Sequence, residues 1–162
     1  MKIKGIWVIT MLMSTTLLNA KIKLPNLIGD NMILQQQTDV KLWGEATPNS
    51  SIKIIPSWSG KEYTCKSDKH GKWLLKVQAP AAGYTPYEIS FDDGEKISIK
   101  NVLIGEVWLA SGQSNMEMPL KGFGGCCIMD GINDIAYASE NKGVRMFTVP
   151  KRQCYDLQIT CE

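Results

Sequence analysis

The stretch that decides the fold reads DKHGKWLLKV and covers residues 68–77. Its apolar residues Trp73, Leu75 and Val77 occupy alternate positions, the period of a strand with one buried face and one solvated face. The preceding DKHG, residues 68–71, supplies a tight turn, because Asp caps its own backbone and Gly adopts a positive φ. The stretch therefore predicts a turn followed by a strand in an antiparallel β fold.

Alternating apolar positions recur on both sides of this stretch, in short runs separated by turn residues. The runs are Met32 to Leu34, Val40 and Leu42, Ile52 and Ile54, Tyr63 and Cys65, Tyr87, Ile89 and Phe91, and Ile97 and Ile99. A second turn of the same chemistry, DDGE at 92–95, separates the last two runs. Seven or so strands at this spacing predict a small antiparallel β-sandwich over residues 21–100, with no helix in it.

The sequence changes character at residue 101. Residues 102–110 are almost continuously apolar, which is typical of a strand buried on both faces of an α/β sheet. Further on, residues 134–140 predict one helix, and the alternation over residues 144–149 predicts a second strand. We therefore expect a mainly β N-terminal sandwich followed, over residues 101–162, by the incomplete start of an α/β domain.

The first 20 residues have the pattern of a secretory signal peptide. Lys2 and Lys4 precede an apolar, uncharged run of about 14 residues, and cleavage is expected after Ala20. A transmembrane anchor is the alternative, which length disfavours, because a bilayer span needs about 20 apolar residues. We expect a secreted or periplasmic protein with no membrane span after cleavage.

Charge and cysteine usage exclude several partners. The chain has 18 Lys and Arg against 16 Asp and Glu, and removing Lys2 and Lys4 leaves 16 of each, so a nucleic-acid partner is not expected. The only histidine is His70, and the five cysteines show no metal-binding spacing, so we expect no metal and no organic cofactor. Cys126 and Cys127 are adjacent, and the sequence leaves disulfides and free thiols equally open.

The segment SGQSNM, residues 111–116, follows the apolar run and is the expected site of chemistry. Small residues allow a sharp turn that projects the Ser114 hydroxyl into solvent, and a helix that begins there aims N–H groups at the same point. The alternative is that Ser114 only caps a helix, which is a common role of serine. The pattern alone leaves both roles open.

The longer block GEVWLASGQSNMEM, residues 105–118, resembles the first motif block of the sialate O-acetylesterase family, which are SGNH-type hydrolases acting on acetylated sugars. Upstream, LIGDNMILQ (27–35) and VKLWG (40–44) resemble the β-sandwich that precedes the flavodoxin-like catalytic domain in bacterial members. KHGKW (69–73) also fits, although His70 stands where the family has an acidic residue. The resemblance covers about residues 24–149.

The resemblance implies that Ser114 is the nucleophile and donates its own N–H to the oxyanion, while Gln113 and Asn115 shape the pocket. Such a hydrolase also needs a His, usually oriented by an Asp, to take the serine proton. The family's late Asp-x-x-His block is absent from these 162 residues. We expect His70 to be an exposed turn residue and not the base.

Two functions follow from these patterns. The first is a secreted carbohydrate esterase, a serine hydrolase that removes O-acetyl groups from sialic acid or related glycans, with this chain truncated and inactive alone. The second is a non-catalytic β-sandwich module that binds a glycan or a protein. For the second function Trp43, Trp58 and Trp73 are the candidate sugar-stacking residues, although Trp43 and Trp73 lie in alternating runs that favour the core.

Overall fold

The computed structural model describes residues 21–124, 128–140 and 143–150, and this part of the chain is mainly β. The strands are β1 (Ile33–Gln35), β2 (Asp39–Glu45), β3 (Ser51–Pro56), β4 (Tyr63–Lys66), β5 (Lys72–Gln78), β6 (Gly83–Asp92) and β7 (Lys96–Gly105). The helices are α1 (Ser114–Glu117) and α2 (Gly131–Glu140). The predicted signal peptide and Cys126, Cys127, Cys154 and Cys161 lie outside the described residues.

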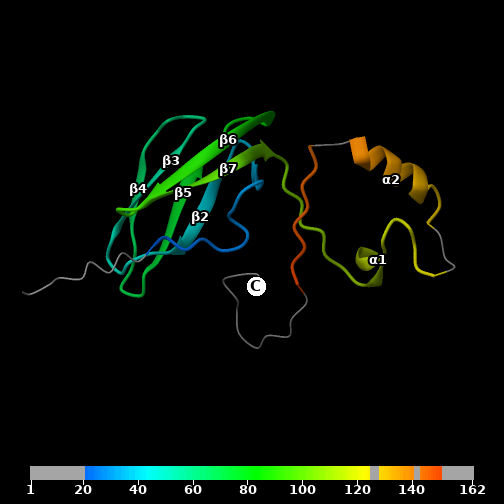
Figure 1. Ribbon diagram of the computed structural model, residues 1–162, viewed down its shortest axis with the longest axis horizontal. Coiled ribbons are helices and arrows are strands. Elements are labelled where there is room, and N and C mark those ends of the chain that lie inside the picture. The colour runs from blue at the N-terminus through cyan, green and yellow to red at the C-terminus, as the bar shows by residue number, and fades with distance from the viewer. Residues whose placement is uncertain (1–20, 125–127, 141–142, 151–162) are drawn as a thin grey trace, which may run out of the picture.

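The strands form two sheets that share one hydrophobic core (Figure 1). One sheet has five strands in the order β1-β7-β6-β3-β4, and the other consists of β2 and β5, paired antiparallel. Leu42 and Val77 of the small sheet belong to the same buried cluster as Ile54 and Phe91 of the large sheet. Apolar burial between the two sheets is therefore the main stabilising term of residues 21–105.

The alternation in β5 confirms the predicted strand. Trp73 and Val77 are buried and Leu75 is half-buried, whereas Lys72 and Leu74 face solvent. Each residue of β5 lies opposite one of β2, so the buried face of one strand continues the buried face of the other.

Both predicted turns form as expected. A carboxylate oxygen of Asp68 accepts hydrogen bonds from the N–H groups of His70 (2.8 Å) and Lys72 (2.9 Å). A carboxylate oxygen of Asp92 accepts one from the N–H of Gly94 at 2.8 Å. Gly71 and Gly94 have φ angles of 81° and 114°, which residues with a Cβ rarely adopt.

The expectation of a purely antiparallel fold is wrong at β1. This strand pairs in parallel with β7, with Ile33 opposite Leu103 and Gln35 opposite Gly105. Parallel neighbours need a long connection, and here all the intervening strands supply it. A local sequence pattern carries no information about a partner strand that is so far away in the sequence.

The prediction that residues 102–110 form a single strand of a separate α/β sheet is wrong. β7 continues through Lys100 to Gly105, so the expected boundary at residue 100 falls inside a strand of the β core. Val102 and Ile104 belong to the core cluster, and the buried Leu103 lines a cavity on the opposite face. Both faces of β7 are thus covered, as the apolar run predicted, but in the five-stranded sheet.

The predicted helix over residues 134–140 is confirmed and begins earlier, at Gly131. The predicted strand over residues 144–149 is wrong, because residues 143–150 form no strand and the apolar residues Val144 and Met146 are exposed. Within the described residues, neither helix combines the length and the apolar character that a bilayer crossing requires.

Candidate functional site

The chain leaves β7 at Gly105 and reaches α1 through residues 106–113, which form no helix or strand. Apolar side chains in this connection are exposed, and Trp108 retains 86% of its accessible surface. The strand therefore does not run straight into a sharp turn at Ser111, as the apolar pattern had indicated.

Ser114 is the first residue of α1, and it is exposed together with Gln113 and Asn115. Gln113 occupies the N-cap position without a side-chain hydrogen bond, and its carbonyl accepts the N–H of Met116 at 2.9 Å. The capping interpretation of Ser114 is therefore wrong, since the capping position belongs to its neighbour. Among the described residues, no hydrogen bond occupies the Ser114 hydroxyl.

Gly112 allows the turn before α1 to close. A Cβ at this position would lie 2.8 Å from Cγ of Met116, which is closer than real Cβ contacts come. Any larger residue at position 112 would have to displace the Met116 side chain.

Glu106 anchors the start of the connection to the β region. Its carboxylate accepts hydrogen bonds from the side-chain amides of Gln35 (2.9 Å) and Gln36 (2.6 Å), and Oε1 of Gln35 also accepts the N–H of Val107 at 2.9 Å. The Gln35 bond, followed by the Gln36 bond, lowers the pKa of Glu106 against a smaller opposing effect of desolvation. These amides hold the charged form of Glu106 and fix where the connection begins.

Arg145 forms a second anchor, between the segment after α2 and the junction of β1 and β7. Its guanidinium donates to the backbone carbonyl of Met32 (2.7 Å), to that of Asn101, and to Oδ1 of Asn101 (3.0 Å). Asn101 has a φ of 55° and its amide donates to Oδ1 of Asn31 at 2.7 Å, so the acceptors are themselves held in place. Burial lowers the pKa of the Arg145 guanidinium.

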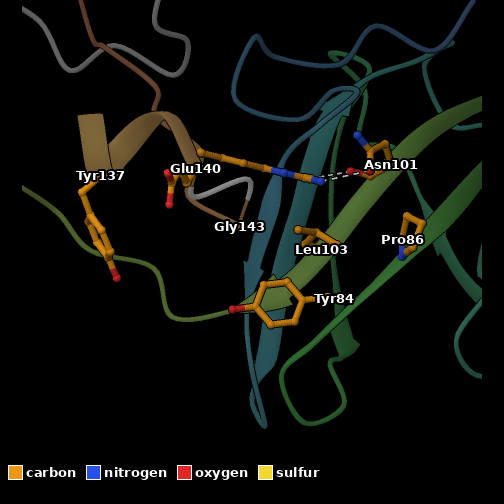
Figure 2. Close-up of a pocket in the computed structure, with 8 residues that line it drawn as sticks. Tyr84, Pro86, Asn101, Leu103, Tyr137, Glu140 and Gly143 are labelled. Atoms are coloured by element: carbon orange, nitrogen blue, oxygen red, sulfur yellow. Dashed lines mark hydrogen bonds between the residues drawn. The ribbon is translucent and has the colours of Figure 1, made fainter. Parts of the chain in front are cut away.

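A cavity of about 640 Å³ lies between α2 and the five-stranded sheet (Figure 2). Tyr137 and Glu140 of α2 lie on one side, and Tyr84, Leu103 and Asn101 lie on the other. These lining residues, like Glu106 and Arg145, were not predicted from the sequence. No local pattern distinguishes them, because the cavity depends on how α2 is placed against the sheet.

Among the described residues, no hydrogen bond joins the Ser114 hydroxyl to a group that could act as its base. His70 lies in the exposed turn between β4 and β5, and these strands lie on the opposite side of the molecule from α1 (Figure 1). The prediction that His70 is a turn residue is confirmed. Among the described residues, no group of three or more His, Cys, Asp or Glu side chains could hold a metal ion.

No family model matches the chain, but individual proteins do. The sialate O-acetylesterase of Pongo abelii is 27% identical over 136 residues, covering 78% of this chain and 25% of that protein. The human sialate O-acetylesterase is 27% identical over 132 residues, covering 75% of this chain and 24% of that protein. The chain thus spans about a quarter of the length of the curated relatives it matches.

Among solved structures, a carbohydrate acetylesterase from Xanthomonas citri is similar, with a TM-score of 0.76 and 35% identity. The match covers 88% of this chain and 31% of that one. By these similarities the chain is related to the ester hydrolases. Within that class the similar proteins are sialate O-acetylesterases and a carbohydrate acetylesterase, which supports the sialate O-acetylesterase-like family that the resemblance of residues 105–118 predicted.

Proposed function

We propose that this chain carries the nucleophile of an exported carbohydrate O-acetylesterase that acts on acetylated sialic acid or related acetylated glycans. The observation that carries the proposal is Ser114, which is exposed at the first position of α1, inside GQSNM, with a hydroxyl that caps no helix. The related proteins are acetylesterases, which supports the reaction type.

Acyl transfer is the proposed mechanism. Oγ of Ser114 attacks the acetyl carbonyl carbon while a base removes the hydroxyl proton, and negative charge develops on the carbonyl oxygen. The Ser114 N–H at the start of α1 has no acceptor within the helix, so it can donate to that oxygen. The ester C–O bond breaks, the sugar oxygen leaves with a proton, and water then releases acetate from Ser114.

The base is assigned to residues outside this chain's 162, because His70 is the only histidine and lies in the β4–β5 turn. We therefore expect the chain alone to have little or no esterase activity toward an aryl acetate. Robust acetate release by the chain alone, abolished in Ser114→Ala, would contradict this expectation. Sequencing the source DNA through and past codon 162 tests whether an Asp-x-x-His block follows.

In this proposal the β region is the sandwich domain of the esterase, and the hydrolase domain begins after Gly105, where β7 ends. Export rests on the basic start and apolar run of residues 1–20. The expected N-terminal residue of protein recovered outside the cytoplasm is Lys21, and recovery with Met1 intact would contradict cleavage.

The direct test completes the chain with a related protein. Residues 1–149 are joined to the remaining part of the Xanthomonas citri carbohydrate acetylesterase, and acetate release from 9-O-acetyl-N-acetylneuraminic acid and from acetylated xylan is measured. We expect activity that falls by about three orders of magnitude or more in Ser114→Ala, as for other serine nucleophiles. Ser111→Ala is the matched control and should retain activity. Equal activity of the Ser114→Ala variant would overturn the proposal.

A further inference from the structure

A second cavity, of about 460 Å³, lies on the β region and uses neither Ser114 nor the α2 segment. Its walls come from residues 23–26, from β2 and β5, and from the region around the β4–β5 turn. In Figure 1, β4 and β5 lie on the side of the molecule away from α1. Any ligand of this cavity is therefore independent of the proposed esterase chemistry.

Backbone contacts preform the cavity. The N–H and carbonyl of Lys23 pair with the carbonyl and N–H of Glu45 at 2.8 and 2.9 Å, which holds residues 23–26 beside β2. Gly44 permits this approach, because a Cβ there would lie 2.5 Å from the Lys23 carbonyl oxygen and 3.0 Å from Cζ2 of Trp73. The cavity is thus fixed by the fold, with little ordering left for a ligand to impose.

Aromatic side chains supply an apolar wall. Trp43 is half-buried on β2, and its cross-strand neighbour Leu74 is 56% exposed. Trp73 lies deeper, at 4% exposure, and its buried Nε1–H has no hydrogen-bond partner among the described residues. Trp58, by contrast, donates its Nε1–H to the Gln78 carbonyl at 3.0 Å and lies outside the cavity.

Three lysines, Lys23, Lys66 and Lys72, also line the cavity, and none forms an ion pair with a described carboxylate. The two acidic residues of the lining are Glu45 and Asp68. The Asp68 carboxylate is engaged by the N–H groups that close the β4–β5 turn. Positive charge therefore exceeds negative charge at the rim, which favours a ligand with a carboxylate.

We propose that this cavity is a binding site for an acidic saccharide. The apolar face of the sugar ring packs on Trp43, as carbohydrate rings do on aromatic side chains that combine apolar area with a polar edge. The sugar carboxylate lies near Lys66 and Lys72, whose ammonium groups donate to its oxygens. The site makes the β region a saccharide-binding module in its own right, whether or not Ser114 is a nucleophile.

The test uses two probes that differ only at one carbon: methyl β-D-glucuronide, which carries a carboxylate, and methyl β-D-glucoside, which does not. Each is titrated into the full chain while the indole N–H resonances are followed by NMR, with Trp43 assigned from Trp43→Phe. We expect the glucuronide to shift the Trp43 resonance and to bind about tenfold more tightly than the glucoside, because a charge-assisted hydrogen bond is lost with the carboxylate.

Substitutions locate the site. Lys66→Gln and Lys72→Gln together should reduce glucuronide affinity to that of the glucoside, and these exposed residues carry little of the folding energy. Lys76→Gln, on the exposed face of β5 but outside the cavity, is the matched control and should bind normally. Equal binding of the two probes, no binding of either, or glucuronide binding unchanged in the double variant would overturn the proposal.

Discussion

The two parts of the chain differ in how far their apolar side chains are buried. In the β region, residues 21–105, one cluster of buried side chains joins both sheets, and Leu42, Ile52 and Phe91 are fully buried. In the Ser114 segment, the described residues among 106–150, α1 buries no residue and α2 buries only Gly131. The β region thus contains its own core, whereas the Ser114 segment depends on two polar anchors, Glu106 and Arg145.

This difference shows how fold and chemistry are divided along the chain. The β region has the burial that stabilises an independent unit. The Ser114 segment leaves large apolar side chains exposed, including Trp108, Leu109 and Met146, which the described residues do not cover. In the proposed esterase these side chains would be buried by the rest of the hydrolase domain.

The largest predicted contrast between the two regions concerns stability. Phe91→Ala removes a fully buried ring and should lower the free energy of unfolding by about 3–5 kcal/mol. Ile135→Ala, on α2 and 45% exposed, should change it by less than about 0.5 kcal/mol. Urea denaturation followed by far-UV circular dichroism measures both. Similar effects of the two substitutions would mean that the regions share one core.

A smaller effect is expected where residues 23–26 meet β2. Gly44→Ala should destabilise the chain by about 1–3 kcal/mol, because the added methyl group meets the Lys23 carbonyl oxygen and the Trp73 ring. Gly29→Ala is the matched control, since a Cβ at Gly29 meets nothing within 4 Å. Thermal unfolding of both variants gives the comparison, and equal melting temperatures would show that this contact is not tight.

The Arg145 anchor should act locally. Arg145→Ala removes hydrogen bonds to Met32 and Asn101, and we expect amide hydrogen exchange in residues 143–150 to accelerate about tenfold while β5 is unchanged. Arg145→Lys keeps the charge without the planar fork and should give an intermediate rate. An unchanged rate of amide hydrogen exchange in Arg145→Ala would show that Arg145 does not anchor residues 143–150.

The smallest effect concerns pH. Gln35 and Gln36 lower the pKa of Glu106 in the folded state. The Glu106 anchor therefore contributes fully to folding stability above the ordinary carboxyl pKa. This contribution to stability is lost as the pH falls through the lowered pKa of the folded state. Carbon-13 NMR of the Glu106 carboxylate should show a midpoint below the usual value. Gln35→Leu should raise that midpoint, Gln78→Leu should leave it unchanged, and an ordinary midpoint in the unsubstituted chain would contradict the anchor.

The β region was predictable because its signals are local. Alternation placed the strands, and Asp68 and Asp92 marked turns whose hydrogen bonds the structure shows. The parallel partner of β7 was not predictable, since register between strands far apart in sequence depends on the whole fold. Trp73 is buried as predicted, whereas Trp43, also expected in the core, is half-buried at its edge and lines a cavity.

The site was predictable only in part. The motif block singled out Ser114, Gln113 and Asn115 as candidates, and the structure exposes all three residues at the start of α1, while their roles stay a prediction. The anchors that hold the segment were not predictable, because Gln35 and Glu106 are far apart in sequence and neither has a distinctive neighbourhood. The alternation of residues 144–149 predicted a strand that does not form, for a related reason. An alternating segment becomes a strand only where it can pair with the edge strand of a sheet.

The most direct test of the central claim, that Ser114 is the nucleophile, is to locate a covalent adduct. The chain completed with the Xanthomonas citri sequence is treated with a fluorophosphonate, digested, and analysed by tandem mass spectrometry. We predict a single modified residue, Ser114, and no adduct in the Ser114→Ala variant. An adduct on Ser111 or another serine, or an active chimera that carries none, would contradict the account.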